Sequence, residues 1–513
     1  MSTTKPIPIQ SQPGIRRDGT LYDGQEYNDG LWTRFYRGRP KKMGGYRAVT
    51  STLPEIVRGM NSYTADAVNY IALGGQSTLT QIRTDSTGNF VASNDRFGAM
   101  VTDAENLWQF AVFNSSATGA PDNKLVAHAA PNLDDISSTV ERQIYYGDIT
   151  ANTGLTATAM DPCSGGIVSI YPYLFGYGNG GRVDVSHVGD LSVANESAFV
   201  TGQKIVKGLP LRGGGGGGAV LLWSLDSLVR GTFDSSILTG VPFDFDTISD
   251  STSILSSQGV LEYDGIYFWI GVDRFLMFNG VVREVPNTMN LNFFFDNINF
   301  SARQKAFAFK IPRWGEIWFC APLGNATECN TAIVYNVREN TWYDTALPAT
   351  GRTIGYFASV YEKPLMVDST LDELAGGYTL WQHETGTDQI NGGNVQPIRA
   401  NITSDEKDFI EQGIDKAMRI DVLEPDLVQV GDVTVTVLGR SNPRAADLES
   451  VSITIPEFDG VDATPLPAED QVIEFKTERR LMRFKIESNT AGGDFYLGKT
   501  MAHVEPTDGR ITQ

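Results

Sequence analysis

The strongest constraint on the fold of this chain is a succession of short β-rich runs, separated by Gly, Asn, Asp and Pro, between about residues 50 and 390. No long stretch of this region repeats its apolar residues at the 3.6-residue spacing of an amphipathic helix. The clearest unit, 265–280, consists of two runs rich in β-branched and aromatic residues, joined by a short turn and closed by Asn-Gly. This unit predicts a β-hairpin, and helices are expected to be minor.

Related units begin at intervals of roughly 40 to 60 residues, close to the period of about 40 to 50 residues at which β-propeller blades repeat. We therefore predict an all-β chain in which residues 49–390 form a degenerate β-propeller of about six blades. No kelch or WD dipeptide recurs in the units. A β-sandwich, or a row of small sandwiches, is the alternative.

The sequence changes in character after the glycine pair at residues 392 and 393. The runs 433–438, 451–455 and 481–486 alternate apolar and polar residues or are rich in β-branched ones, with Gly and Asn turns between them. Residues 391–513 are therefore expected to form a separate antiparallel β-sandwich.

The first 47 residues carry nine Lys and Arg against four Asp and Glu, a net charge of +5, whereas the whole chain carries −20. We predict that residues 1–48 form an extended basic arm that docks on a neighbouring subunit, and that a chain without residues 1–47 still folds. A solvated lead-in is the alternative. The candidate docking residues are Arg16, Arg17, Arg34, Arg37, Arg39, Lys41 and Lys42.

Composition excludes several classes of protein. A net charge of −20 disfavours a free-standing, sequence-reading nucleic-acid binder, because phosphate affinity needs clustered Lys and Arg. Three cysteines without metal-ligand spacing predict neither a disulfide framework nor a zinc site. The N-terminus lacks an apolar signal region, and no apolar run approaches the roughly 18 residues of a membrane span, so we expect neither secretion by a signal peptide nor membrane insertion.

Motifs of catalysis are also missing from the sequence. The four histidines are far apart, and no nucleophile elbow, zincin motif or phosphate loop occurs. Asp244, Asp246 and Asp250 loosely resemble a calcium loop but lack its turn glycine and bidentate glutamate, which favours a solvated acidic loop. The run Gly213–Gly218 lacks the Lys and Ser or Thr that hold phosphate, and is expected to be a flexible loop. We therefore expect no enzyme activity, no catalytic residue, no metal and no cofactor.

The aromatic side chains of the hairpin and two of the cysteines are expected to be buried in the structure. The aromatics of the hairpin 265–280, such as Trp269 and Phe278, are expected to be buried between blades, although a sugar-binding platform is the alternative. Cys320 and Cys329 flank one hairpin loop and are expected to be free buried thiols, although they could also face each other.

Three stretches, in order along the chain, resemble one family. Residues 223–230 and the hairpin 265–280 are similar to its middle, and residues 479–510 are similar to its terminal strands. The opening of the family is an aromatic and basic strand that runs into Gly-x-Pro-x-Lys-x-Gly-Gly. The matching residues here are Asn28-Asp29-Gly30-Leu31-Trp32-Thr33-Arg34-Phe35-Tyr36-Arg37-Gly38-Arg39-Pro40-Lys41-Lys42-Met43-Gly44-Gly45-Tyr46, preceded by Gly14-Ile15-Arg16-Arg17-Asp18-Gly19-Thr20. The family is the packaged-DNA stabilisation, or tail nozzle, proteins of short-tailed bacteriophages.

This resemblance implies a structural virion protein, assembled in the host cytoplasm into the phage tail. Six copies would form a ring below the head-to-tail adaptor, close the DNA channel, carry fibres or spikes, and let double-stranded DNA pass without tight binding. It implies no catalytic residue. The candidate channel loop is Gly213, Gly214, Gly215, Gly216, Gly217 and Gly218. The alternative is a tail receptor-binding adhesin, or a glycan depolymerase, with a propeller or sandwich fold.

Overall fold

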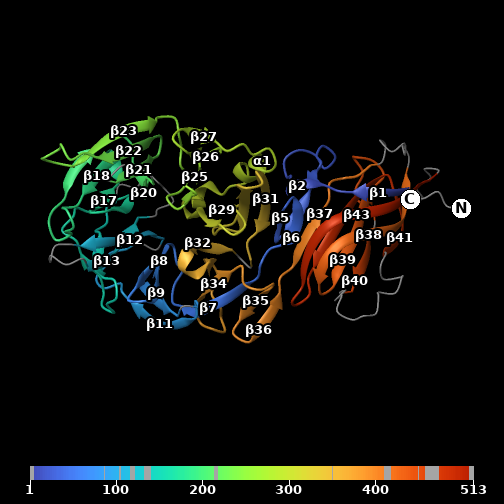
Figure 1. Ribbon diagram of the computed structural model, residues 1–513, viewed down its shortest axis with the longest axis horizontal. Coiled ribbons are helices and arrows are strands. Elements are labelled where there is room, and N and C mark those ends of the chain that lie inside the picture. Colours follow the sequence, from blue (N-terminus) through green and yellow to red (C-terminus); the bar gives the residue numbers. More distant parts are fainter. Residues whose placement is uncertain are drawn as a thin grey trace.

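A computed structural model describes residues 5–85, 87–102, 105–115, 122–131, 140–212, 218–348, 351–408, 417–448, 450–456 and 473–507. The described chain is almost entirely β, as predicted, with one short α-helix, α1 (Leu291–Phe295), and three 3-10 turns, η1 (Asn179–Gly181), η2 (Phe300–Lys305) and η3 (Ser359–Tyr361). It forms two bodies side by side, a propeller and a sandwich that contains both ends of the described chain (Figure 1).

The propeller has seven blades within the described residues, each a four-stranded antiparallel sheet. Blade 1 is β8 (Met60–Ala65), β9 (Val68–Gly74), β10 (Leu79–Thr84) and β11 (Phe90–Asp95). Blade 2 is β12 (Leu107–Ser115), β13 (Asp122–Ala130), β14 (Tyr145–Asp148) and β15 (Thr156–Ala157). Blade 3 is β16 (Gly166–Ile170), β17 (Tyr173–Tyr177), β18 (Arg182–Val185) and β19 (Glu196–Phe199). Blade 4 is β20 (Ile205–Pro210), β21 (Ala219–Ser224), β22 (Leu228–Phe233) and β23 (Phe243–Ser249).

The remaining blades follow the same order. Blade 5 is β24 (Val260–Tyr263), β25 (Ile266–Ile270), β26 (Phe275–Phe278) and β27 (Val282–Glu284). Blade 6 is β28 (Phe307–Ile311), β29 (Glu316–Ala321), β30 (Thr331–Asn336) and β31 (Thr341–Ala346). Blade 7 is β32 (Arg352–Ala358), β33 (Lys363–Asp368), β34 (Tyr378–His383) and β7 (Tyr46–Leu53), and its sheet continues into β35 (Asp388–Asn391) and β36 (Asn394–Pro397).

Blade 7 closes the ring with strands from both ends of the propeller. Its outer strand β7 precedes blade 1 in sequence and pairs with β34, where Ala48 lies opposite Trp381. The inner strand of blade 7, β32, packs against β8 of blade 1. The sequence predicts about six blades, and the described structure has seven, the last of which is completed by β7.

The sandwich consists of two sheets that enclose an apolar core. One sheet has the order β41 (Ile473–Arg479), β38 (Met418–Val430), β43 (Asp494–Pro506), β6 (Arg39–Lys42), β5 (Thr33–Tyr36), with β1 (Lys5–Ile9) also on β43. The other has the order β4 (Asp29–Leu31), β37 (Ala400–Thr403), β42 (Leu481–Ser488), β39 (Val433–Arg440), β40 (Val451–Ile455). The strands expected at 433–438, 451–455 and 481–486 are neighbours in this second sheet.

The N-terminal segment differs from the extended, independent arm expected for residues 1–48. Within 5–42, strand β1 pairs along β43, β4 pairs with β37, and β2 (Gln12–Ile15) pairs with β3 (Glu26–Tyr27). Ile7 and Ile9 alternate with exposed residues and bury their side chains in the sandwich. The segment is therefore part of the sandwich, and the propeller is inserted between the two portions of the chain that build this body.

Candidate functional site

The inner strands of the seven blades surround a pocket of about 790 Å³ on the propeller axis. Every inner strand contributes residues to its wall: β8, β12, β16, β20, β24, β28 and β32. Small residues let these strands approach one another. A Cβ atom at Gly355 of β32 would lie 2.7 Å from Cδ1 of Phe309 on β28, and one at Gly208 of β20 would lie 2.8 Å from Cγ1 of Val168 on β16.

Side chains cross the axis at the end where the inner strands begin. Gln258, just before β24, donates through Nε2 to the carbonyl oxygens of Arg58 at 2.5 Å and Trp108 at 3.4 Å. These partners belong to the starts of blades 1 and 2, which lie across the ring from blade 5. Arg58 also binds Glu328 of blade 6 through two hydrogen bonds of 3.0 and 2.7 Å. The axis is thus closed at this end to anything as wide as a DNA duplex.

The pocket carries more positive than negative charge. Its charged lining residues are three cations, Lys207, Arg212 and Lys310, and one acid, Glu262. The Glu262 carboxylate accepts from the Gly265 N–H at 2.7 Å and from Lys310 Nζ at 3.2 Å, and Arg212 lies 3.6 Å away. Burial opposes ionisation of Glu262, but these donors outweigh it and lower its pKa. Lys310 and Arg212 are therefore engaged with the acid of the pocket.

Lys207 is different from the other pocket cations. Its ammonium has no hydrogen-bond or ion-pair partner among the residues that the structure describes. The side chain keeps some exposure toward the pocket but is surrounded by the protein, and burial lowers its pKa to about 8. A cation without a partner in a ring of inner strands is the most unusual chemical feature of the axis.

The docking residues predicted in the N-terminal segment are mostly used inside the molecule. Arg34 is 1% exposed and pairs with Glu316 and Glu384 at 2.8 and 2.6 Å, so it is unavailable to a partner. The Lys42 ammonium donates to the Gly493 carbonyl at 2.6 Å, and burial lowers its pKa. Arg16, Arg17 and Lys41 pair with Asp23, Asp344 and Asp494 at 3.3, 2.9 and 3.8 Å.

The exposed member of the predicted set lies in an aromatic and basic cluster at the junction of the two bodies. Arg37 lies over the ring of Tyr36, 5.2 Å from its centroid. Tyr36 meets Trp314 edge to face at 5.4 Å, and the exposed Arg313 lies over Trp314 at 5.0 Å. We call Tyr36, Arg37, Arg313 and Trp314 the junction cluster. Arg39, two residues after Arg37, is half-buried.

Most of the predicted channel loop lies outside the described residues, namely Gly213, Gly214, Gly215, Gly216 and Gly217. Gly218 is described, with a φ of +79° that favours glycine, directly before β21. Arg212, on the other side of the run, lines the axial pocket.

The solvated acidic loop expected at Asp244, Asp246 and Asp250 is instead mostly a strand. Asp244 and Asp246 lie on strand β23, where Asp246 pairs with Arg230 at 3.0 Å, and Asp250 follows the strand. No group of three His, Cys, Asp or Glu suited to a metal ion occurs in the described part of the chain. Cys320 and Cys329 are free and buried.

One Cys–His pair was not foreseen from the sequence. The sulfur of Cys163 lies 3.3 Å from Nε2 of His128, and both residues are buried. Burial lowers the pKa of His128 to about 4 and raises that of Cys163 to about 12, so both are neutral near pH 7. The pair lacks the thiolate that a nucleophilic cysteine needs.

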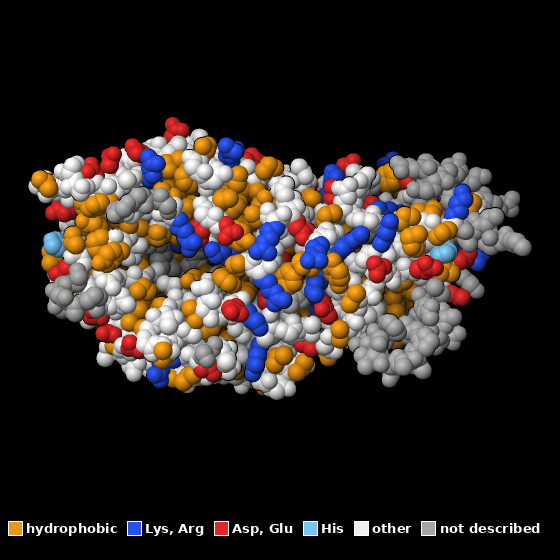
Figure 2. Space-filling model, in the orientation of Figure 1, with side chains coloured by type: hydrophobic (Ala, Val, Ile, Leu, Met, Phe, Trp, Pro, Cys, Tyr) orange, Lys and Arg blue, Asp and Glu red, His pale blue; other side chains and the backbone are white. Residues whose placement is uncertain are grey.

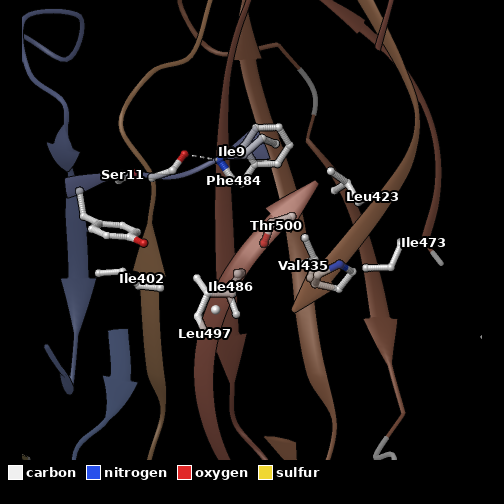
Figure 3. A pocket seen from close by; sticks show the side chains of 14 residues that line it. Ile9, Ser11, Ile402, Leu423, Val435, Ile473, Phe484, Ile486, Leu497 and Thr500 are labelled. Atoms are coloured by element: carbon white, nitrogen blue, oxygen red, sulfur yellow. Dashed lines mark hydrogen bonds between the residues drawn. The ribbon is translucent and has the colours of Figure 1, made fainter. Parts of the chain in front are cut away.

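A second cavity, of about 30 Å³, lies between the two sheets of the sandwich (Figure 3). Its wall is largely apolar, with Ile402, Leu423 and Ile486 among the residues that point into it. Of the two serines that line it, Ser404 accepts a hydrogen bond from the Phe484 N–H at 3.0 Å. The cavity has room for about one or two waters and is a packing space of the core.

Comparison with known proteins gives likenesses to solved structures only. No family model matches the chain, and no curated protein matches it. A solved structure described as an ancestral GH74 enzyme is similar over 73% of this chain, with 10% identity and a TM-score of 0.40, and the match spans 52% of that enzyme's chain. The prediction that the present chain is not an enzyme is contradicted by this neighbour and is withdrawn. A likeness at this level assigns no reaction or residue role to the chain.

The described residues include no helix long and apolar enough to cross a membrane.

Sequence reasoning missed the axial pocket because its charged residues come from different blades. Lys207 lies in β20, whereas Glu262 and Lys310 lie in β24 and β28. A usable signal exists in the run Ile205-Val206-Lys207-Gly208-Leu209, where a lysine interrupts an apolar strand. Such a lysine must either reach water or face a cavity.

Proposed function

We propose that this chain is a structural subunit of a short bacteriophage tail, in which six copies form a nozzle below the head-to-tail adaptor. The observation that carries this proposal is the ordered resemblance of residues 14–46, 223–230, 265–280 and 479–510 to the tail nozzle family. In this role the ring closes the DNA channel, retains packaged DNA and lets it pass on ejection.

The arrangement of the resembling stretches supports the proposal. Residues 14–46 and 479–510 are far apart in sequence, but their strands form one body: β4 and β42 both pair with β37, and Tyr496 of β43 lies opposite Lys41 of β6. The family likeness at the two ends of the chain therefore falls on one folding unit. The likeness in the middle falls on blades 4 and 5 of the inserted propeller.

The charge distribution supports a ring in which a basic surface of one subunit contacts an acidic surface of its neighbour. Lys and Arg side chains gather in a band across the middle of the face shown in Figure 2, on a chain whose net charge is −20. The junction cluster combines Trp, Tyr and Arg, the residue types that dominate the energetic centres of protein interfaces. Such a surface suits an acidic neighbour, either another copy or the adaptor.

The same distribution suits a conduit that does not hold DNA tightly. An acidic chain whose N-terminal cations are largely paired internally offers little of the counterion release that drives DNA binding. The propeller axis is crossed by Gln258, so the DNA path in this proposal runs between subunits. Retention would then depend on a constriction made by loops.

The test is the behaviour of particles that lack this protein. The proposal expects them to fill with DNA and then lose it, while purified protein, alone or with its adaptor, assembles into rings of six. Particles that keep their genome and fail only in adsorption to cells would contradict the nozzle role. They would favour the second candidate, a receptor-binding adhesin, for which the basic and aromatic axial pocket is the specific observation.

A further inference from the structure

We infer that the axial pocket of the propeller binds a small carboxylated saccharide, with the ammonium of Lys207 available to its carboxylate. This inference goes beyond the proposed nozzle, because a ring of subunits needs no small ligand.

The charge balance of the pocket calls for an anionic ligand. Three cations and one acid line it, and the acid Glu262 is already engaged by Lys310 and Arg212. Lys207 is left without a partner in the described structure, in a surrounding that disfavours its charge. An unpaired charge held away from bulk water costs free energy. A ligand carboxylate would give Lys207 the ion-pair partner that the described residues do not supply, through a charge-assisted hydrogen bond.

The aromatic lining favours a ligand with apolar faces. Trp108, Phe110, Tyr267, Phe309 and Tyr356 come from four different blades and all line the pocket, and Phe110 and Tyr356 are the half-buried members of this set. A saccharide ring has C–H faces that pack on aromatic rings and hydroxyl groups at its edges. A volume of about 790 Å³ also falls within the usual range of small-molecule sites.

The backbone favours hydroxyl groups over a free phosphate. Among the described residues each inner strand forms a ladder on one side only. On the other edge some groups are engaged, such as the N–H groups of Gly208 and Ala308, which donate to Tyr177 and Gln258, and other N–H and C=O groups of this edge face the axis. Serine hydroxyls of Ser62 and Ser169 add groups that both donate and accept. A sugar offers several hydroxyl groups that donate and accept around its ring, whereas phosphate near pH 7 carries one or two P–OH donors beside oxygens that only accept.

The experiment is calorimetric titration of the full chain at pH 7 with cellobiuronic acid, its neutral counterpart cellobiose, and inorganic phosphate. We expect the acid to bind at least about tenfold more tightly than cellobiose, because a hydrogen bond to a charged group contributes about 1.5 to 3 kcal/mol. Lys207→Met should remove this advantage, so that the acid binds no more tightly than cellobiose, while Lys207→Arg should keep much of it.

Lys499→Met, at an exposed lysine of the sandwich, is the matched control and should behave as the wild type. Thermal unfolding of each variant checks that the propeller is intact. Equal affinity for acid and neutral sugar, tighter binding of phosphate than of the acid, no binding of either sugar, or an unchanged affinity in Lys207→Met would each overturn the inference. None of these results bears on ring assembly or DNA retention, so failure here is distinguishable from failure of the nozzle proposal.

Discussion

Arg34 of strand β5 in the sandwich and Glu316 of strand β29 in blade 6 form an ion pair of 2.8 Å, with side-chain exposures of 1% and 0%. Glu384, after blade 7, binds the same guanidinium through two hydrogen bonds of 2.6 and 2.7 Å. Burial raises the pKa of Glu316, against the opposing effect of Arg34. The two bodies are thus joined by a buried charge network, and the apolar core is also continuous across the boundary.

Arg34→Ala should therefore destabilise the whole molecule. Removing one partner of a buried ion pair leaves the other charge uncompensated and typically costs about 3 to 5 kcal/mol. Urea unfolding followed by tryptophan fluorescence would measure the loss. Arg37→Ala, three residues along at an exposed position, is the control and should change the midpoint little. Equal midpoints for the two variants would show that the network does not hold the bodies together.

Deletion of residues 1–47 is expected to prevent folding of the sandwich. Without these residues β43 loses its partners β1 and β6, β37 loses β4, and blade 7 loses the start of β7. This reverses the expectation from charge alone, that the truncated chain folds. Soluble yield and circular dichroism of the truncated chain, compared with a chain that lacks residues 1–4 only, decide between the two. A cooperative unfolding transition at the wild-type temperature would contradict the structure-based expectation.

Trp269→Ala should lower the melting temperature sharply. The predicted hairpin 265–280 is confirmed as β25 and β26, and Trp269 is fully buried between blades 4 and 5, edge to face with Trp223 at 5.8 Å. Truncation of such a residue costs about 3 to 5 kcal/mol. Val272→Ala, at a position 42% exposed in the hairpin turn, is the matched control. If the two variants melt alike, the indole does not contribute as its burial indicates.

The sequence predicted the strands well because their signals are local. The alternation of residues 433–438 and the turn chemistry around the hairpin 265–280 are contained in a few neighbouring residues, and both elements are where the patterns indicate. The boundary between propeller and sandwich could also be predicted from the sequence. The glycine pair at residues 392 and 393 lies in the turn between β35 and β36, just before the chain returns to the sandwich.

The placement of the N-terminal segment could not be predicted, because charge does not reveal its partner. Arg34 is neutralised by Glu316 and Glu384, and Arg17 by Asp344 together with the nearby Asp29. All but Asp29 lie about three hundred residues away in sequence. The same non-local assembly hid the axial pocket, which exists only when seven inner strands are brought together. Ring closure by β7 likewise depends on a pairing with β34 that no local pattern encodes.

Acidification should destabilise the propeller between about pH 6.5 and pH 4. Burial lowers the pKa of His128 from 6.5 to about 4, so in this window the unfolded chain binds a proton that the folded chain excludes. Stability therefore falls as the pH falls, by at most about 1.4 kcal/mol per pH unit for one such group. Nε2 of His128 lies 3.2 Å from the Cys163 carbonyl oxygen, and the positive charges of Arg142 and Lys204 further lower its pKa.

His128→Gln should flatten this dependence, since it removes the titrating group but keeps a neutral polar side chain. His187→Gln, at an exposed histidine, is the control and should retain the wild-type slope. Urea midpoints at several pH values between 4 and 7 measure both. Identical slopes for all three proteins would mean that His128 does not exclude the proton in the folded state.

The last prediction concerns assembly rather than stability. The double variant Arg37→Glu with Arg313→Glu reverses two exposed charges of the junction cluster and leaves the buried Arg34 network in place. If the nozzle proposal holds and the cluster contacts an acidic neighbour, like charges now face each other across the interface. Incorporation into tails should then fall while the melting temperature stays near that of the wild type. Arg230→Glu, at an exposed position on blade 4, is the control for charge reversal elsewhere on the surface.

Complementation of particles that lack the protein measures incorporation and genome retention together. Normal tails from the double variant would place the docking surface elsewhere, and loss of incorporation in both variants would attribute the effect to net charge rather than to the junction cluster.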